Sequence, residues 1–434
     1  MDIVQLIVIG ALGAMAAMLT NKGIAVFNDG LRPIMPEYHH DGTISKQELA
    51  ATSFAISFGL VVGFGIPISI GASILLIHSV LLMTDIIGTW TPSTRIGLII
   101  AGVLGALWGV GLTLGLQFIV DIFELLPVNF LDDLGMIGNP IVVAFSVFPA
   151  VAVAYQHGFK RGAITGGLSV LVLFLVREFG TFTLPGGASL TLSAEGMTLL
   201  VGMAFMVFFA IKVKGDETTD NQDLVSIFSE RVKMIKKNTI LLSLTGGLVA
   251  AATSLTLIAG DPISLSLMEG GQFGEAALAA FARGIGFIPL VFSTAIVTGV
   301  YSPAGATFVF TVGILLQGNP IVAFLLGALV MFLEITLLRG AATGLDKFPG
   351  VREMGDHIRT AMSRVLEVAL LVGGALASEQ IAPGIGFFWV IGVYLLNKTA
   401  KKPLVDMAVG PVAAIALGII VNILYVLSLW TPAG

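Results

Sequence analysis

Residues 282–305 read ARGIGFIPLVFSTAIVTGVYSPAG, and this stretch decides how the chain can fold. It is apolar enough for a bilayer, yet it contains one arginine, two prolines, four glycines and several hydroxyl side chains. Proline and glycine free backbone groups from the helical ladder, and at membrane depth such groups need protein or a polar cavity around them. The stretch therefore predicts a broken helix that lines a substrate site, as in many secondary transporters. A kinked structural helix with an interfacial arginine is the alternative.

The composition is that of a polytopic membrane protein. The 434 residues are 56% hydrophobic and only 11% charged, with a mean hydropathy of +0.98. A soluble domain carries roughly a quarter charged residues. Cysteine is absent, which excludes disulfides and thiol chemistry. The net charge of −5 gives no indication of nucleic-acid binding. We expect no cofactor and no metal site, and we interpret the first apolar run as a retained helix.

The apolar blocks of the sequence have about the length needed to cross a bilayer. They cover residues 3–20, 50–67, 69–87, 95–120, 141–157, 161–178, 196–212, 238–259, 283–300, 303–317, 320–338, 361–378, 384–397 and 404–429. Several blocks are short, and the pairs at 50–87 and 283–317 could instead be re-entrant hairpins. The sequence thus predicts an all-α integral membrane protein with about 10–14 transmembrane helices, some of them broken or re-entrant.

The distribution of charge gives the topology. Basic residues concentrate in cytoplasmic loops of membrane proteins. In this chain they cluster at 160–161, 212–237, 339–364 and 398–402, whereas the acidic connections at 121–133 and 261–269 contain none. Alternating the apolar blocks across the membrane satisfies all of these assignments and leaves both termini outside.

The chain divides near its middle into two membrane halves. Residues 215–237 are polar and too short for a folded domain, so we interpret them as a cytoplasmic linker between 1–214 and 238–434. The sequence GNPIVVAF at 138–145 is nearly repeated as GNPIVAF at 318–324. This echo predicts two related halves. The topology makes the repeat parallel, although one miscounted block would invert it.

Ionisable residues inside apolar runs are functional candidates, because a charge in hydrocarbon is costly. Glu334 and Glu367 could each carry a coupling proton if they are buried. Snorkelling, or pairing with Arg339 or Arg364, would explain them without a function. His78 could relay protons, or it could be a neutral histidine bonded to a neighbouring helix.

Two asparagines begin the echoed segments. Asn139 and Asn319 each precede a proline at a predicted helix start, where the partial positive charge of the helix favours anions. Arg283 adds a fixed positive charge, so we expect an anionic or zwitterionic solute. Asp29 and Arg32 follow the first helix and form either a gate loop or an ordinary capped turn.

Hydroxyl and amide groups near the predicted break complete the proposed substrate site. The expected substrate-binding residues are Arg283, Ser293, Thr294, Thr298, Tyr301, Ser302, Asn139 and Asn319.

Long motifs at 25–34, 283–289, 298–301 and 362–373 resemble the YhfT family of bacterial inner-membrane proteins. The resemblance implies a multi-pass transport protein of the bacterial inner membrane. Genes of the YhfT family tend to lie near those of enzymes of pyridoxal phosphate and phosphotriesterase-like type. This neighbourhood suggests that the solute is amino-acid-like or phosphorylated. More distantly, the chain is similar to ascorbate-type and galactitol-type phosphotransferase membrane subunits, which are elevator-like dimers. Phosphotransfer would need a separate partner, since no soluble phosphoryl-carrying domain is present.

We therefore expect a secondary transporter that moves a small polar organic solute by alternating access, as an elevator-like homodimer in the bilayer. The coupling ion is either a proton or sodium. An intramembrane enzyme, with His78 and Glu334 as acid and base, is the alternative, although the chain has no HExxH or GxSxG motif. A phosphotransferase-like membrane subunit that needs separate partners is a further alternative.

Overall fold

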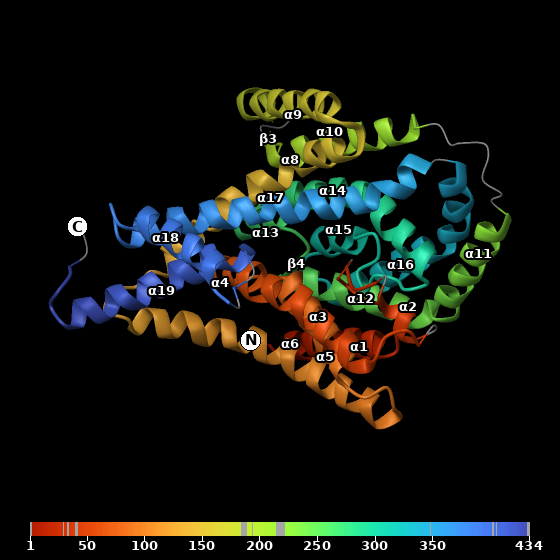
Figure 1. Cartoon of the computed structure of the whole chain (residues 1–434), viewed down its shortest axis with the longest axis horizontal. Helices are drawn as coiled ribbons and strands as arrows, with labels where there is room; N and C mark the ends of the chain where they lie inside the picture. Colours follow the sequence, from red (N-terminus) through yellow and green to blue (C-terminus); the bar gives the residue numbers. More distant parts are fainter. Residues whose placement is uncertain are drawn as a thin grey trace.

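The computed structural model describes the whole chain except residues 1, 29, 33, 40–41, 184–188, 193, 214–221, 348, 402, 405 and 432–434. Helices dominate the described residues, and Figure 1 shows them as long rods running in several directions. The helices before residue 214 are α1 (Ile3–Asn21), α2 (Ile34–His39), α3 (Lys46–Leu60), the π-helix η1 (Val61–Gly65), α4 (Ile66–Ala72), α5 (Ile77–Trp90), α6 (Arg95–Leu125), α7 (Leu131–Gly135), α8 (Gly138–His157), α9 (Phe159–Phe179) and α10 (Ala194–Ile211).

The rest of the chain begins with the linker helix. The helices after residue 221 are α11 (Gln222–Lys237), α12 (Thr239–Ser254), α13 (Pro262–Glu269), α14 (Phe273–Thr298), α15 (Phe308–Leu315), α16 (Pro320–Lys347), α17 (Pro349–Ile381), α18 (Gly386–Thr399) and α19 (Asp406–Val426). The strands are very short: β1 (Leu75–Leu76), β2 (Thr181–Thr183), β3 (Ser189–Thr191) and β4 (Ile258–Ala259).

Helix starts follow local sequence signals. Asp2 caps α1 in a capping box with Gln5, and Ser45 caps α3 in the same way with Glu48. Asp261 caps α13 and is followed by proline in the first turn. These side chains satisfy backbone N–H groups that have no partner inside the helix.

The lengths and compositions of the helices confirm a membrane-embedded protein. Among the described residues, seven helical stretches are long and apolar enough to cross a bilayer. They lie in α1, α6, α9, α10, α16, α17 and α19, and the shorter apolar helices α5 and α12 lie beside them. Many large apolar side chains on these helices are exposed, as expected for surfaces in contact with lipid.

Glycine allows two helix pairs to pack closely. Gly13 of α1 lies against the backbone of Gly105 on α6, so that a β-carbon at Gly13 would overlap the Gly105 carbonyl. In the later part of the chain Gly246 of α12 lies against Gly327 of α16, whose carbonyl oxygen would lie 3.2 Å from a β-carbon at Gly246. Small residues at such contacts let transmembrane helices approach and gain van der Waals contact.

Two groups of three helices flank these pairs. α8, α9 and α10 pack on one another, and so do α17, α18 and α19, while α8 and α17 join the two groups. In Figure 1 α8, α9 and α10 lie at one edge of the molecule, and α1, α5 and α6 lie at the opposite edge.

Non-helical segments from the two parts of the chain pair at two crossings. In the first crossing Ala25 forms a parallel β-bridge with Tyr301. In the second crossing β1 pairs in parallel with β4, with Leu75 opposite Ile258. The sequence predicts a helix broken near Arg283. In the structure α14 continues through Arg283 as far as Thr298, and the non-helical break comes after it, over residues 299–307.

The linker helix α11 covers one end of this arrangement. It packs against α14 and α16, with Val232 and Ile235 buried. The side chains of Arg231 and Met234 lie within van der Waals distance of where a β-carbon at Gly299 would be. The amphipathic helix α11, in the segment that the sequence predicts to be a linker, thus packs on the other helices at the point where α14 ends.

We predict that Gly13→Val destabilises the protein, because the added side chain must push α1 away from α6. Overpacking of this kind costs about 1–3 kcal/mol of unfolding free energy. The measurement is the melting temperature of detergent-purified protein, followed by size-exclusion chromatography after heating. Gly111→Val on α6 is the matched control, since no atom lies near a β-carbon there. An equal melting temperature for the two variants would contradict the prediction.

Candidate functional site

Arg283 is the central cation of the second crossing. It lies on α14 and is only 3% exposed. Its Nη1 donates a hydrogen bond to the carbonyl oxygen of Gly260 and lies 3.5 Å from Oδ2 of Asp261. The guanidinium also lies over the rings of Phe310 and Phe287, at 5.0 and 5.7 Å from their centroids. Among the described residues its Nε and Nη2 have no hydrogen-bond partner.

Asp261 is fully buried and is held by the start of α13. Its Oδ1 accepts a hydrogen bond from the Ser264 N–H at 2.8 Å, and its Oδ2 accepts one from the Ser264 hydroxyl at 2.7 Å. The carboxylate is therefore already fixed at a helix N-terminus, where negative charge is favoured. It can orient Arg283 without giving up its own partners.

His78 lies in the first turn of α5, two residues after the end of β1. Its ring packs edge-on against Phe27 and Phe64, with centroids 5.2 and 5.0 Å away. It lies within electrostatic reach of Arg283. Its buried Nδ1 has no hydrogen-bond partner in the described part of the chain. His78 thus lies among aromatic rings, with one buried ring nitrogen that has no partner among the described residues.

Glu334 is a buried carboxylate at the first crossing, 6% exposed on α16. Its Oε2 accepts hydrogen bonds from the Tyr301 hydroxyl at 3.0 Å and from the Ala306 N–H at 2.7 Å. Its Oε1 has no partner among the described residues. A β-carbon at Gly305 would overlap Oε2, so glycine is needed for the non-helical segment to reach the carboxylate.

Asp85 is the matching buried carboxylate on α5. Its Oδ1 accepts hydrogen bonds from the Thr20 hydroxyl at 3.0 Å and the Phe27 N–H at 3.1 Å, and its Oδ2 accepts one from the Asn28 N–H at 2.8 Å. Like Glu334, it satisfies backbone donors of a segment that has left the helix. Asp85 therefore holds the segment that contains Ala25, and Glu334 holds the segment that contains Tyr301.

Arg32 supplies the positive charge at this crossing. It is 2% exposed, and it donates from Nε to the Val26 carbonyl at 3.0 Å and from Nη2 to the Phe27 carbonyl at 3.3 Å. Its charge acts on both Asp85 and Tyr301. The first crossing is therefore a buried network of one cation and two carboxylates, joined through the paired backbone.

Two further residues of the predicted substrate site, Thr298 and Ser302, lie at the end of α14 and just after it. Thr298 bonds locally, accepting from the Val300 N–H at 3.1 Å and donating to the Thr294 carbonyl at 2.6 Å. Ser302 is buried and accepts from the Ala304 N–H at 3.3 Å.

Other candidates lie apart from the crossings or outside the described residues. Asn319 is exposed at the start of α16. Glu367 is partly buried near the middle of α17, where it pairs with the exposed Arg364 at 3.2 Å and accepts a hydrogen bond from the Tyr394 hydroxyl at 3.5 Å. Asp29 lies outside the described residues, as do the side chains of Ser293 and Asn139.

The sequence reasoning missed Asp85 and Asp261. Asp85 lies in the apolar run LLMTDIIG, so the rule that selected Glu334 would have selected it too. Asp261 lies in a connection that we interpreted as an acidic outer loop. Its sequence position carried no sign that it would face Arg283.

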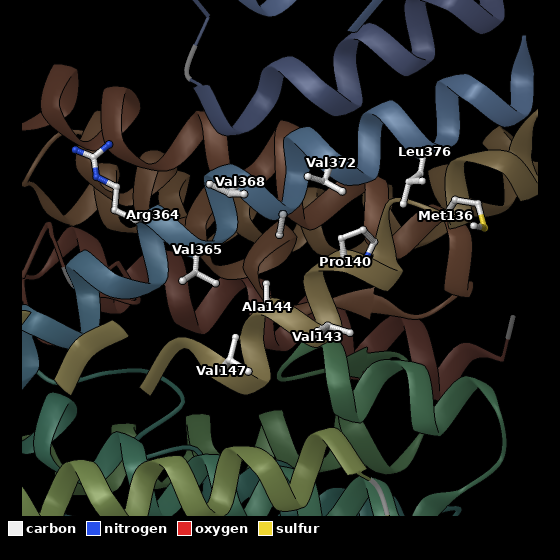
Figure 2. A pocket seen from close by; sticks show the side chains of 11 residues that line it. Met136, Pro140, Val143, Ala144, Val147, Arg364, Val365, Val368, Val372 and Leu376 are labelled. Carbon is white, nitrogen blue, oxygen red and sulfur yellow. The ribbon is translucent and has the colours of Figure 1, made fainter. Parts of the chain in front are cut away.

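The described residues also form an open, apolar groove of about 640 Å³ between α8 and α17. Figure 2 shows its valines projecting from the two helices, with Arg364 and Met136 at opposite ends. Its lining is almost entirely hydrocarbon, which suits an acyl chain and not a polar solute. Within the described ranges, no group of three or more His, Asp or Glu side chains could hold a metal ion.

Comparison with known proteins places the chain among its relatives. The profile of the YhfT family, described as a protein of unknown function, matches residues 5–430. The chain belongs to the YhfT family. It is 35% identical over 442 residues to the uncharacterized protein YhfT of Escherichia coli strain K12, covering 99% of both chains. No solved structure matches the chain.

We predict that Tyr301→Phe lowers the unfolding free energy by about 1–3 kcal/mol, because Glu334 loses one of its donors in a buried site. The measurement is the melting temperature of the purified protein. Tyr425→Phe removes a hydroxyl from a 40% exposed side chain and is the control, which we expect to be neutral. A wild-type melting temperature for Tyr301→Phe would show that the hydrogen bond contributes little.

Proposed function

We propose that this YhfT-family protein is a secondary transporter for a small anionic or zwitterionic organic solute, working by alternating access. The observation that carries the proposal is Arg283, a buried arginine whose Nε and Nη2 lack hydrogen-bond partners among the described residues. A buried donor without a partner costs about 1–3 kcal/mol, and more when it is charged. A carboxylate or phosphate oxygen would satisfy both nitrogens in the bidentate geometry that arginine prefers.

The surroundings of Arg283 favour a solute site over a purely structural ion pair. Asp261 balances one side of the guanidinium, and aromatic rings contact its faces. The two nitrogens that remain are the ones a ligand would use. Non-helical backbone at membrane depth is tolerated where it lines a cavity or is buried in protein, and transporters place their sites at such breaks.

We also propose that Glu334 carries the coupling proton if protons drive transport. It is buried, it has one oxygen without a partner in the described part of the chain, and it holds the segment that follows the break. Glu367 is less suited, since it pairs with an exposed arginine. Sodium is equally compatible, because carbonyl and hydroxyl oxygens of unwound segments can coordinate it.

Homodimerisation, elevator-like movement and a location in the bacterial inner membrane belong to the same proposal. The many long apolar helices support a bilayer location. Family membership supports the bacterial setting.

A ligand screen tests the solute class. We expect an anionic or zwitterionic compound, among organic acids, amino acids and sugar phosphates, to raise the melting temperature of the purified protein. At a hundred times its dissociation constant a ligand stabilises the native state by about 2.7 kcal/mol. Arg283→Lys should lose this shift, since an ammonium group cannot bind bidentately. Arg95→Lys, at an exposed position, should keep it. A hit that survives Arg283→Lys would remove Arg283 from the site.

Accumulation in proteoliposomes tests the coupling. With the solute from the screen, Glu334→Gln should abolish accumulation driven by a pH gradient, because the amide cannot take up a proton in this range. Glutamine keeps one acceptor oxygen for the Ala306 N–H, so folding should survive. Glu367→Gln is the matched control and should transport normally. If Glu334→Gln still responds to the pH gradient, the proton is carried elsewhere.

A further inference from the structure

The packing partners of α1 to α10 recur among α12 to α19. α1 packs against α5 and α6, and α12 packs against α15 and α16. α3 contacts α5 as α14 contacts α15, and the groups α8–α10 and α17–α19 have the same internal contacts. The leading members also touch each other, since α1 contacts α12 and α8 contacts α17. Two related units that face each other across an approximate two-fold axis would produce this set of contacts.

Equivalent residues around the first helix of the two units are separated by the same distance in the sequence, as a repeat requires. One constant offset carries Gly13, which packs on α6, to Gly246, which packs on α16. The same offset carries Gly23, with φ +66°, to Thr256, with φ +58°. In each unit this left-handed residue follows the first helix, and the crossing residue comes two positions later. The two units therefore leave their first helix by the same backbone geometry.

The two crossings exchange with each other under this relation. Ala25 pairs with Tyr301, and Leu75 pairs with Ile258, both in parallel. The offset of 233 residues that relates Gly13 to Gly246 also carries Ala25 to Ile258, and an offset of 226 residues carries Leu75 to Tyr301, so the first crossing becomes the second. An arbitrary arrangement would have no reason to give two crossings of the same kind, related in this way.

The number of passes assigned to the first unit decides the relative orientation of the two units. We assign one membrane pass each to α1, the continuous α3–η1–α4 segment, α5, α6, α8, α9 and α10, of which α1, α6, α9 and α10 are long and apolar enough by themselves. This assignment gives the first unit an odd number of passes. The second unit therefore starts on the other side. The GNP echo at 138–145 and 318–324 does not mark this repeat, because it opens α8 and α16, which have different packing partners. The inverted repeat inferred below therefore rests on these packing partners, whereas the parallel repeat indicated by the echo stays a prediction.

The first unit provides an internal reference for the charged site of the second. The offset that carries Ala25 to Ile258 also carries Asn28 to Asp261. The offset that carries Leu75 to Tyr301 also carries Ser57 to Arg283. Nδ2 of Asn28 donates to the Ser57 hydroxyl at 2.9 Å, whereas Asp261 and Arg283 form an ion pair at 3.5 Å. The same junction is thus closed by a neutral hydrogen bond in one unit and by a buried ion pair in the other. A buried ion pair is often no more stabilising than a neutral replacement.

We infer that the chain is an inverted repeat whose second unit has converted a neutral structural junction into an anion-binding site, with Arg283 as the binding residue and Asp261 as its positioning residue. This inference rests on the proposed transport function for the role of the anion. The repeat itself, and the dispensability of the two charges for folding, stand apart from that function. The anion binds at Nε and Nη2 of Arg283, while Asp261 holds Nη1.

A double substitution tests whether the charges serve the fold. Asp261→Asn with Arg283→Ser gives the second unit the residue pair of the first. We expect the double variant to melt within about 3 °C of the wild type, and each single variant to melt lower by more than about 5 °C, because each leaves one buried charge unpaired. A double variant as unstable as the singles would show that the ion pair is structural and would overturn the inference.

Thiol labelling tests whether the site is reached from water. The chain has no cysteine, so an introduced one is the only target. In the double variant Asp261→Asn/Arg283→Cys, we expect reaction with a membrane-impermeant sulfonatoethyl methanethiosulfonate from at least one side of sealed vesicles. Ala250→Cys, in the packed core of α12, is the unreactive control. Failure of position 283 to react from either side would exclude a solute site there.

The orientation of the repeat has its own test. Thr43 and Gln272 are exposed in the loops that precede α3 and α14, which are equivalent in the two units. Thr43→Cys and Gln272→Cys should label from opposite faces of the membrane. Labelling from the same face would overturn the inverted repeat. If labelling succeeds at 283 and at both loops, but no solute shifts melting or accumulates, the proposed function fails while the site and the repeat stand.

Discussion

The structure depends on satisfying backbone hydrogen bonds where helices stop inside a low-dielectric interior. After α1 and α14 the chain is extended, and the Val26 N–H donates to the Tyr301 carbonyl at 2.9 Å while the Tyr301 N–H donates to the Ile24 carbonyl at 3.0 Å. Each segment supplies the partners that the other lacks. Neither non-helical segment would be stable there alone, because an unsatisfied backbone group in hydrocarbon costs several kcal/mol.

The buried charges follow from the same requirement. Asp85 and Glu334 accept from backbone N–H groups of the two non-helical segments, and Arg32 donates to carbonyls of the segment after α1. Charges thus replace the partners that a continuous helix would have provided. Arg283 differs, since only one of its three guanidinium nitrogens bonds to the described protein. This contrast separates the residues that close the fold from the residue that is available to a ligand.

The sequence predicted the coarse architecture because hydropathy and loop charge act locally. It selected Arg283, Glu334 and Tyr301 because arginine, glutamate and broken-helix residues are unusual in apolar runs. It could not foresee that Asp261, in an acidic connection, would fold back to Arg283, since that contact depends on the paired strands β1 and β4. It placed weight on Asn319, which is exposed, because an eight-residue echo says nothing about which helices pack together.

Four residues other than glycine have positive φ angles in the described chain, and three of them, Ser73, Thr256 and Thr307, adjoin the crossings. Such backbone conformations store about 1–3 kcal/mol each when other contacts enforce them. The hydrogen bonds and buried charges of the crossings must therefore offset this strain, so that strain and bonding oppose each other where the helices stop.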